Sequence, residues 1–193
     1  MNYRKAEIED IGDIEKLQKK YHIDTISEED KADGFVTTLF TAGQFRELIE
    51  KEGGIALALD GSRLAGYAMA ASWEYWSSWP LFEYMIENLK TISFLNQQLS
   101  KENSYQYGPI CIDKEYRGTE VLPNLFETSR LLMKDRFGVL VTFINQNNPR
   151  SFKAHTQKLG LEVIGTFSFN HNEYFELGYD TSRETPGATT GTG

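Results

Sequence analysis

One stretch of the sequence constrains the fold more than any other. Across residues 107–133, an apolar strand pattern, a polar loop and an amphipathic helix pattern follow one another directly. A strand that runs into a helix start leaves several backbone N–H groups unpaired, and the helix dipole favours negative charge there. Spacing alone leaves two interpretations open, an ordinary strand-to-helix turn or a loop that holds a phosphate group.

The rest of the chain alternates between strand and helix periodicity. Thr41 and Gln44 match a capping box, Asp60 before a glycine predicts a hairpin turn, and Asn148 before a proline predicts a helix start. Expected strands cover residues 4–8, 55–59, 64–71, 107–112, 139–144, 161–169 and 174–179, and expected helices begin near residues 11, 41, 80, 122 and 149. This order predicts an α/β protein with a mixed sheet.

Composition narrows the class of protein. About 40% of the residues are hydrophobic and 25% are charged, which is typical of a soluble domain. The formal net charge is -8, and the sequence shows no cluster of basic residues like those on nucleic-acid-binding proteins. No nucleic-acid partner is therefore expected. No apolar run is long enough to span a membrane, and the first residues lack a signal-peptide pattern. With a single cysteine, Cys111, we expect a cytoplasmic protein without a membrane partner.

Residues 73–104 interrupt an otherwise continuous sheet pattern, and we interpret them as an aromatic-rich insertion. One interpretation is a lid that shapes a substrate pocket. The other is packing in the core or in the interface of a homodimer, since aromatic side chains dominate both. As a lid, the insertion would bring Trp73, Glu74, Tyr75 and Trp76 to the substrate.

Two segments resemble a known family. Residues 112–118, Ile-Asp-Lys-Glu-Tyr-Arg-Gly, resemble the segment that opens the acetyl-CoA site in the GNAT superfamily of N-acetyltransferases. Residues 145–160, with Asn-Pro-Arg-Ser at the helix start and Lys-Leu-Gly at its end, resemble the later strand–helix unit of that family. The resemblance implies the GNAT acyl-CoA N-acyltransferase fold over residues 1–181, a mixed and mostly antiparallel sheet flanked by helices. Residues 182–193 lack large apolar side chains and are expected to be a disordered tail.

The resemblance also implies a function. The chain would use acetyl-CoA as a co-substrate and transfer the acetyl group directly to an amine of a small molecule or protein. Tyr107 would join the insertion residues at the acceptor side. No metal is expected, because the three histidines show no ligand spacing. Coenzyme contacts would come from Ile110, Cys111, Ile112, Arg117, Gly118, Thr119, Glu120, Val121, Leu122, Asn148 and Ser151.

The catalytic acid depends on how the last helix is counted. The family often places a tyrosine there to protonate the leaving thiolate. Counted from Asn148 the matching residue is His155, and counted back from Gly160 it is Thr156, since one residue more than usual separates the two anchors. A histidine suits the task because its pKa lies near neutrality. We therefore name His155 as the candidate acid and Asn148 as a second catalytic candidate.

Two departures from the family pattern keep other functions open. Glu120 and Leu122 stand where the family's loop commonly has small residues. The carboxylates that could act as a base, Glu74 and Asp113, carry no motif of their own. The alternatives are a non-catalytic module that binds acyl-CoA or regulates, and an interaction domain that has lost CoA and uses the aromatic insertion as its contact surface.

Overall fold

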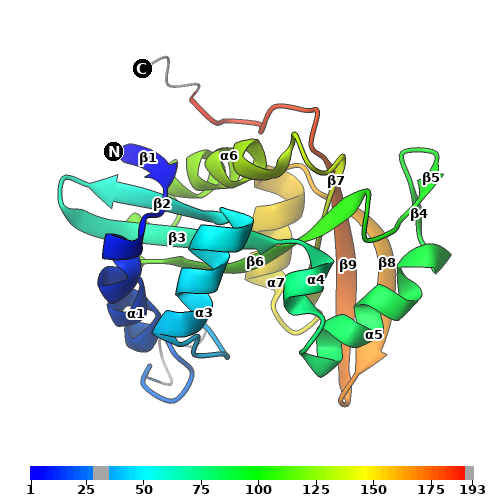
Figure 1. Ribbon diagram of the computed structural model, residues 1–193, viewed down its shortest axis with the longest axis horizontal. Coiled ribbons are helices and arrows are strands. Elements are labelled where there is room, and N and C mark those ends of the chain that lie inside the picture. The colour runs from blue at the N-terminus through cyan, green and yellow to red at the C-terminus, as the bar shows by residue number, and fades with distance from the viewer. Residues whose placement is uncertain (28–34, 190–193) are drawn as a thin grey trace.

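A seven-stranded sheet forms the centre of the computed structural model, which describes residues 1–27 and 35–189 (Figure 1). The strand order is β1-β2-β3-β6-β7-β9-β8. Every neighbouring pair is antiparallel except β6 and β7, which run parallel. The predicted mixed, mostly antiparallel sheet is therefore confirmed. Its strands are β1 (Asn2–Lys5), β2 (Ile55–Asp60), β3 (Arg63–Ala71), β6 (Ser104–Ile112), β7 (Val139–Asn145), β8 (Glu162–Phe169) and β9 (Asn172–Asp180).

Helices cover both faces of this sheet (Figure 1). Side-chain alternation along β2 shows why, because Leu57 packs toward α1 and α3 while Ala56 and Ala58 pack toward α6. The small alanines let α6 lie close to the sheet. The helices and their continuations are α1 (Ile11–Lys20), α3 (Ala42–Glu47) with the π-helical turn η2 (Leu48–Glu52), α6 (Val121–Met133), and α7 (Pro149–Lys153) with the π-helical turn η5 (Ala154–Lys158).

Most of the local sequence signals act as predicted. The Thr41 hydroxyl accepts a hydrogen bond from the Gln44 amide and completes the capping box of α3. Gly53, at a φ of 64°, ends the following turn in the left-handed conformation that glycine favours. The Asp10 carboxylate, at the residue before α1, binds the Arg4 guanidinium through two bonds of 2.7 Å and does not cap the helix. The first strand covers Asn2–Lys5, so it begins and ends before the predicted range of residues 4–8.

The insertion packs on the α1 side of the sheet, over β7, β8 and β9 (Figure 1). Trp73 and Trp76 have no exposed surface, and the Trp73 indole donates to the Ser104 hydroxyl at 3.0 Å. These two tryptophans therefore lie in the core and not on a pocket wall, whereas Glu74 is exposed and Tyr75 is half-buried. The insertion contains α4 (Trp73–Trp76), α5 (Pro80–Asn88), the 3-10 turn η3 (Leu89–Thr91) and a hairpin of β4 (Ser93–Phe94) and β5 (Gln97–Gln98).

The segment after β9 packs onto α6, which differs from the disordered tail expected from its composition. The Thr185 hydroxyl and amide both donate to the Glu127 carboxylate, at 2.5 and 3.1 Å. Thr189 donates to the Asn124 side chain in the same way. Polar bonds to buried partners hold this segment, and hydrophobicity patterns do not detect such bonds. Residues 190–193 lie outside the described residues.

Replacing Thr185 tests this packing. Thr185→Val should lower the free energy of unfolding by about 2 kcal/mol, because the buried Glu127 carboxylate loses a charge-assisted hydrogen bond. Urea unfolding of the full chain measures the change. The exposed neighbour provides the control, since Glu184→Gln should change stability by less than about 0.5 kcal/mol. Equal stability of the two variants would show that the segment does not pack.

Candidate functional site

The central feature of the sheet is a gap between its two parallel strands. β6 and β7 pair only at three positions, Ser104 with Val139, Tyr105 with Leu140 and Gln106 with Val141. A β-bulge follows in β6. Between the pair of Tyr107 with Ala70 and the pair of Ile110 with Ala68, two residues of β6 oppose one residue of β3. Beyond Gln106 the strands separate, and each keeps only its outer neighbour, β3 or β9.

The edge of β6 that borders the gap carries unpaired backbone groups. The Asp113 amide donates to the Ala65 carbonyl of β3, so alternate residues further back along the strand also face β3. The backbone groups of Ile110 and Ile112 therefore face the gap. Of these, the Ile112 carbonyl accepts a bond from the Arg117 side chain at 2.8 Å. An extended ligand with amide groups could add to this edge as a further strand does.

The loop after β6 presents a cluster of free amides, the feature that the phosphate-loop interpretation of the sequence requires. Gly118 has a φ of 80°, and the backbone turns there into the start of α6. The Thr119 hydroxyl occupies the amide of Val121. Within the described part of the chain, no acceptor takes the amides of Gly118, Thr119, Glu120 or Leu122. The Glu120 side chain is exposed to solvent, so its carboxylate leaves the cluster accessible to an anion.

Asp113 anchors this loop to the rest of the fold. Its carboxylate accepts bonds from Lys20 at 2.9 Å, from the Tyr21 hydroxyl at 2.9 Å and from Arg63 at 3.1 Å. Burial raises the pKa of Asp113, but the bonds from these three groups outweigh it and bring the pKa down to about 2. A carboxylate of this kind cannot serve as a general base near neutral pH. Its role is to position the loop.

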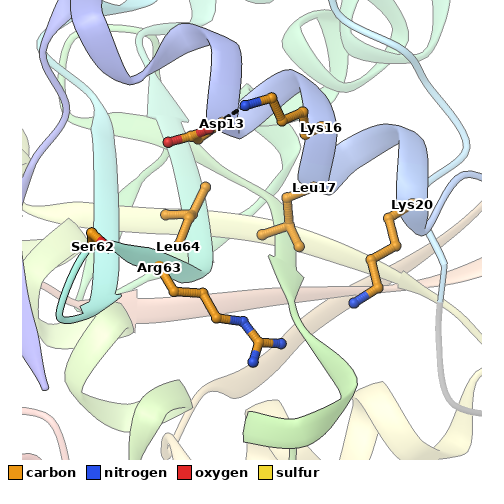
Figure 2. A pocket seen from close by; sticks show the side chains of 7 residues that line it. All are labelled: Asp13, Lys16, Leu17, Lys20, Ser62, Arg63 and Leu64. Carbon is orange, nitrogen blue, oxygen red and sulfur yellow. Dashed lines mark hydrogen bonds and ion pairs between the residues drawn. The ribbon is translucent and has the colours of Figure 1, made fainter.

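Figure 2 shows the basic side chains beside this anchor. Lys20 from α1 and Arg63 from β3 approach from opposite sides of a hollow of about 240 Å³, while Lys16 turns to Asp13. Each of the three cations already has a carboxylate partner, since Lys20 and Arg63 bind Asp113. The hollow therefore borders the ion pairs by which Asp113 holds the loop.

His155 lies in the π-helical turn η5, which continues α7. Its side chain is buried, with 6% exposed, and its ring packs 6.4 Å from that of Tyr107. Nδ1 lies 2.8 Å from the Ser151 carbonyl oxygen, which can only accept. The neutral ring therefore carries its hydrogen on Nδ1 and a lone pair on Nε2. Burial lowers the pKa of His155, although the bond to Ser151 opposes this.

The π-helical turn also explains the extra residue between the two anchors of this helix. The Leu159 amide donates to the Ala154 carbonyl, a bond that spans five residues instead of four. Asn148 caps the helix start, where its side-chain oxygen accepts from the Ser151 amide at 3.0 Å. The Thr156 hydroxyl donates to the Phe152 carbonyl at 2.8 Å, so the helix itself occupies that group.

Two other residues singled out in the sequence are enclosed in the core. Tyr107 has no exposed surface, and its hydroxyl has no partner among the described residues. Cys111 is buried beside α1, and desolvation raises the pKa of its thiol to about 12. A thiol with so high a pKa is not a nucleophile at neutral pH.

Sequence reasoning missed Gln106 at the point where the strands separate. Its side-chain nitrogen donates to the Tyr107 carbonyl at 2.8 Å, while its buried oxygen has no partner within the described part of the chain. An unpaired buried oxygen is costly and suits a ligand that donates a hydrogen bond. The only signal in the sequence was a polar residue in an apolar strand.

Solved structures share this architecture over nearly the whole chain. They include smu.2055 from Streptococcus mutans UA159 (TM-score 0.61, 15% identity, covering 94% of this chain and 99% of that chain) and the ribosomal-protein-alanine N-acetyltransferase from Brucella melitensis (0.58, 14%, 93% and 99%). A third is yncA from Salmonella typhimurium, solved with acetyl-CoA as its cofactor (0.59, 12%, 93% and 93%). This protein has the GNAT acetyltransferase fold. No protein-family model matches the sequence, and no curated protein matches it significantly.

The end of the β6–β7 pairing, the β6 edge and the amide cluster follow one another along the chain between Gln106 and Leu122. Among residues 1–27 and 35–189, no group of histidine, cysteine and acidic side chains could hold a metal ion. The helices of the same residues include none long and apolar enough to cross a membrane.

The Asp113 anchor has a measurable pH signature. Because its folded-state pKa of about 2 lies below the ordinary 3.8, the ionised carboxylate stabilises the fold above pH 4 and loses this effect as the pH falls toward 2. Asp113→Asn should therefore lower stability at pH 7 by on the order of 1 kcal/mol, since water screens the half-exposed Lys20 and Arg63. Thermal unfolding should show the difference from wild type shrinking between pH 4 and 2.

The control for this experiment is Asp13→Asn, which removes a carboxylate paired only with the exposed Lys16. Its unfolding temperature should follow that of wild type at every pH. A constant difference between Asp113→Asn and wild type from pH 7 to pH 2 would contradict the role of the anchor.

Proposed function

We propose that this protein is an acetyl-CoA-dependent N-acetyltransferase that transfers the acetyl group directly to a primary amine. The single observation that carries the proposal is the gap between β6 and β7, which ends in a cluster of four unpaired amides. A cytoplasmic location and an acceptor that is either a small molecule or a peptide belong to the same proposal. The neighbours that share the fold include an N-acetyltransferase and a structure holding acetyl-CoA, which supports this class of reaction.

The residues at the gap fit the three parts of the coenzyme. The amides of Ile110 and Ile112 would pair with the pantetheine arm along the open edge of β6. The amides of Gly118, Thr119 and Glu120, with that of Leu122, would hold the pyrophosphate at the start of α6. Val121 would contribute through its position in the first turn, because its own amide is occupied by Thr119. Ser151 and Asn148 would border the thioester end through α7.

Bound acetyl-CoA supplies an activated acetyl group, and the chain supplies position and proton transfer. The Gln106 side-chain oxygen would accept a hydrogen bond from the incoming amine where the strands separate, and hold its nitrogen toward the thioester. His155 would act through Nε2, whose lone pair takes the proton that the amine loses. The imidazolium would then return this proton to the departing sulfur, so that the products are the amide and free CoA.

A non-catalytic module that binds acyl-CoA is the second candidate. The observation that favours it is the burial of His155, since a ring with 6% exposed surface reaches the reacting atoms only if Nε2 faces the gap. The two candidates share coenzyme binding and differ in proton transfer. An experiment on the loop therefore tests the coenzyme binding that they share, and acetyl-transfer kinetics separate them.

Calorimetry with CoA and acetyl-CoA tests the loop. Gly118→Pro removes one amide donor and forces a φ near -65° where the structure has 80°, so CoA affinity should fall at least tenfold, or by about 1.5 kcal/mol. The matched control is Gly61→Pro, which creates the same conflict at a φ of 60° in the β2–β3 turn. It should retain CoA binding. Wild-type protein that binds neither CoA nor acetyl-CoA would exclude both candidates.

Acetyl-transfer kinetics test His155. His155→Phe keeps a ring but removes both nitrogens, so kcat should fall by about 10²- to 10⁴-fold while CoA affinity is retained. The wild-type rate should rise with pH through a pKa below 6.5, because burial lowers the pKa of this base. The control, Thr156→Val, removes the residue favoured by the other count and should leave kcat within about threefold. An unchanged rate in His155→Phe would exclude His155 as the proton carrier, whereas wild-type protein that binds acetyl-CoA without transferring the acetyl group would favour the non-catalytic module.

A further inference from the structure

A second pocket lies away from the gap, under the insertion. It has a volume of about 260 Å³ and lies between α5, η3 and the edge strand β8. Figure 1 shows α5 crossing in front of β8 and β9 on this side of the sheet. Tyr84, Ile92, Ile164 and Phe167 contribute apolar or aromatic surface to its wall. Its size and lining suit a small organic molecule.

Glu176 is one of the residues that line this pocket. Alternation along β9 directs Leu177 toward α6 and Glu176 toward the insertion. The Glu176 side chain is buried, with 5% exposed, and no described residue donates a hydrogen bond to it. A buried carboxyl group without a donor costs stability, so a structural role within the described residues does not explain it.

The surroundings of Glu176 define what could satisfy it. A carboxylate only accepts hydrogen bonds, so the ligand must donate, and no Lys, Arg or His lines the pocket to neutralise the charge. Burial raises the pKa of Glu176 to about 7, as expected for an acid that lacks a cation; Tyr84 is the only other titratable group in the lining. The lining also includes the polar residues Asn88, Thr91, Ser93 and Thr166, but Glu176 is its single carboxylate. Among the described residues no group of histidine, cysteine and acidic side chains could hold a metal ion, which needs several oxygen ligands.

Space beside the carboxyl group is left open by a glycine. A Cβ atom on Gly165 would lie 3.4 Å from Glu176 Oε2, so the missing side chain gives a ligand access to that oxygen. The rings of Tyr84 and Phe167, with centroids 5.7 Å apart, can pack against an apolar body and attract a cation through their faces.

An aromatic wall separates this pocket from the gap. Phe143 of β7 lies opposite Glu176 in the sheet register. It packs against Phe82 at 5.8 Å, Phe167 at 6.3 Å and Tyr174 at 5.5 Å. A molecule bound at Glu176 would therefore not reach an acyl group held along β6. The pocket goes beyond the proposed transfer reaction and does not depend on it.

We propose that the pocket between α5 and β8 binds a small primary amine with a flat apolar body, whose ammonium group pairs with Glu176. The ammonium donates to the carboxylate, and the apolar body lies against Tyr84 and Phe167. The site acts as a binding site and not as a second acetylation centre.

Calorimetry on the full chain at pH 8, without CoA, tests the site. The probe is 2-phenylethylamine, and its neutral counterpart is 2-phenylethanol. Wild type should bind the amine at least roughly tenfold more tightly than the alcohol, because only the amine forms a charge-assisted hydrogen bond. Glu176→Gln keeps the shape and should weaken amine binding by roughly tenfold to a hundredfold. Glu173→Gln, an exposed glutamate on the same strand, is the control and should bind as wild type does.

A second variant narrows the pocket without altering its charge. Gly165→Ala adds a methyl group at ordinary contact distance from Glu176, and should weaken the amine while the protein stays folded. Equal binding of amine and alcohol by wild type, or full amine binding by Glu176→Gln, would overturn the proposal. If Glu176→Gln fails to fold, unchanged amine affinity in Gly165→Ala overturns it. CoA affinity should be the same in wild type, Glu176→Gln and Gly165→Ala. If the protein does not bind CoA, the proposed function is contradicted, but the amine-binding test of this pocket is not affected.

Discussion

The separation of β6 from β7 is the constraint on which the rest of the site depends. Parallel strands hydrogen-bond along their length unless something prevents it, and here pairing stops after Gln106 and Val141. The bulge in β6 keeps the strand paired with β3 while it turns away from β7. Backbone groups that would be satisfied in a continuous sheet are therefore exposed to the gap. A ligand with amide groups is the natural partner for such an edge.

Several residues that are distant in the sequence hold the loop after β6 in place. Asp113 collects bonds from α1 and β3, and Arg117 returns to the Ile112 carbonyl while its guanidinium lies 4.5 Å from the centre of the Tyr21 ring. These bonds set the path of the chain before Gly118, so the amides that follow remain unpaired. Rigid support of an exposed cluster is what lets a site bind without reorganising.

Buried polar groups divide into two kinds in this fold. Glu127 is satisfied by Arg130 and Thr185, and it fastens the segment after β9 to α6. Glu176 and the oxygen of Gln106 have no donor among the described residues, although each is almost fully buried. Satisfied groups stabilise the fold, whereas an unsatisfied group beside an opening can accept a hydrogen bond from a ligand. Gln106 and Glu176 lie on opposite sides of Phe143, one beside the gap and the other beneath the insertion.

Local chemistry decided which elements form. The capping box at Thr41, the hairpin turn after Asp60 and the Asn148 cap all depend on neighbours within a few residues, and the sequence predicted each of them. The GNAT fold was implied by the resemblance of residues 112–118 and 145–160 to that family, and the adjoining strand, loop and helix of residues 107–122 left a phosphate loop as one of two interpretations. Tertiary structure alone decided that Trp73 and Trp76 are core, that Asp113 anchors the loop, and that Glu176 lies in a pocket. Each of these depends on which distant side chains meet, and no periodicity along the chain records that.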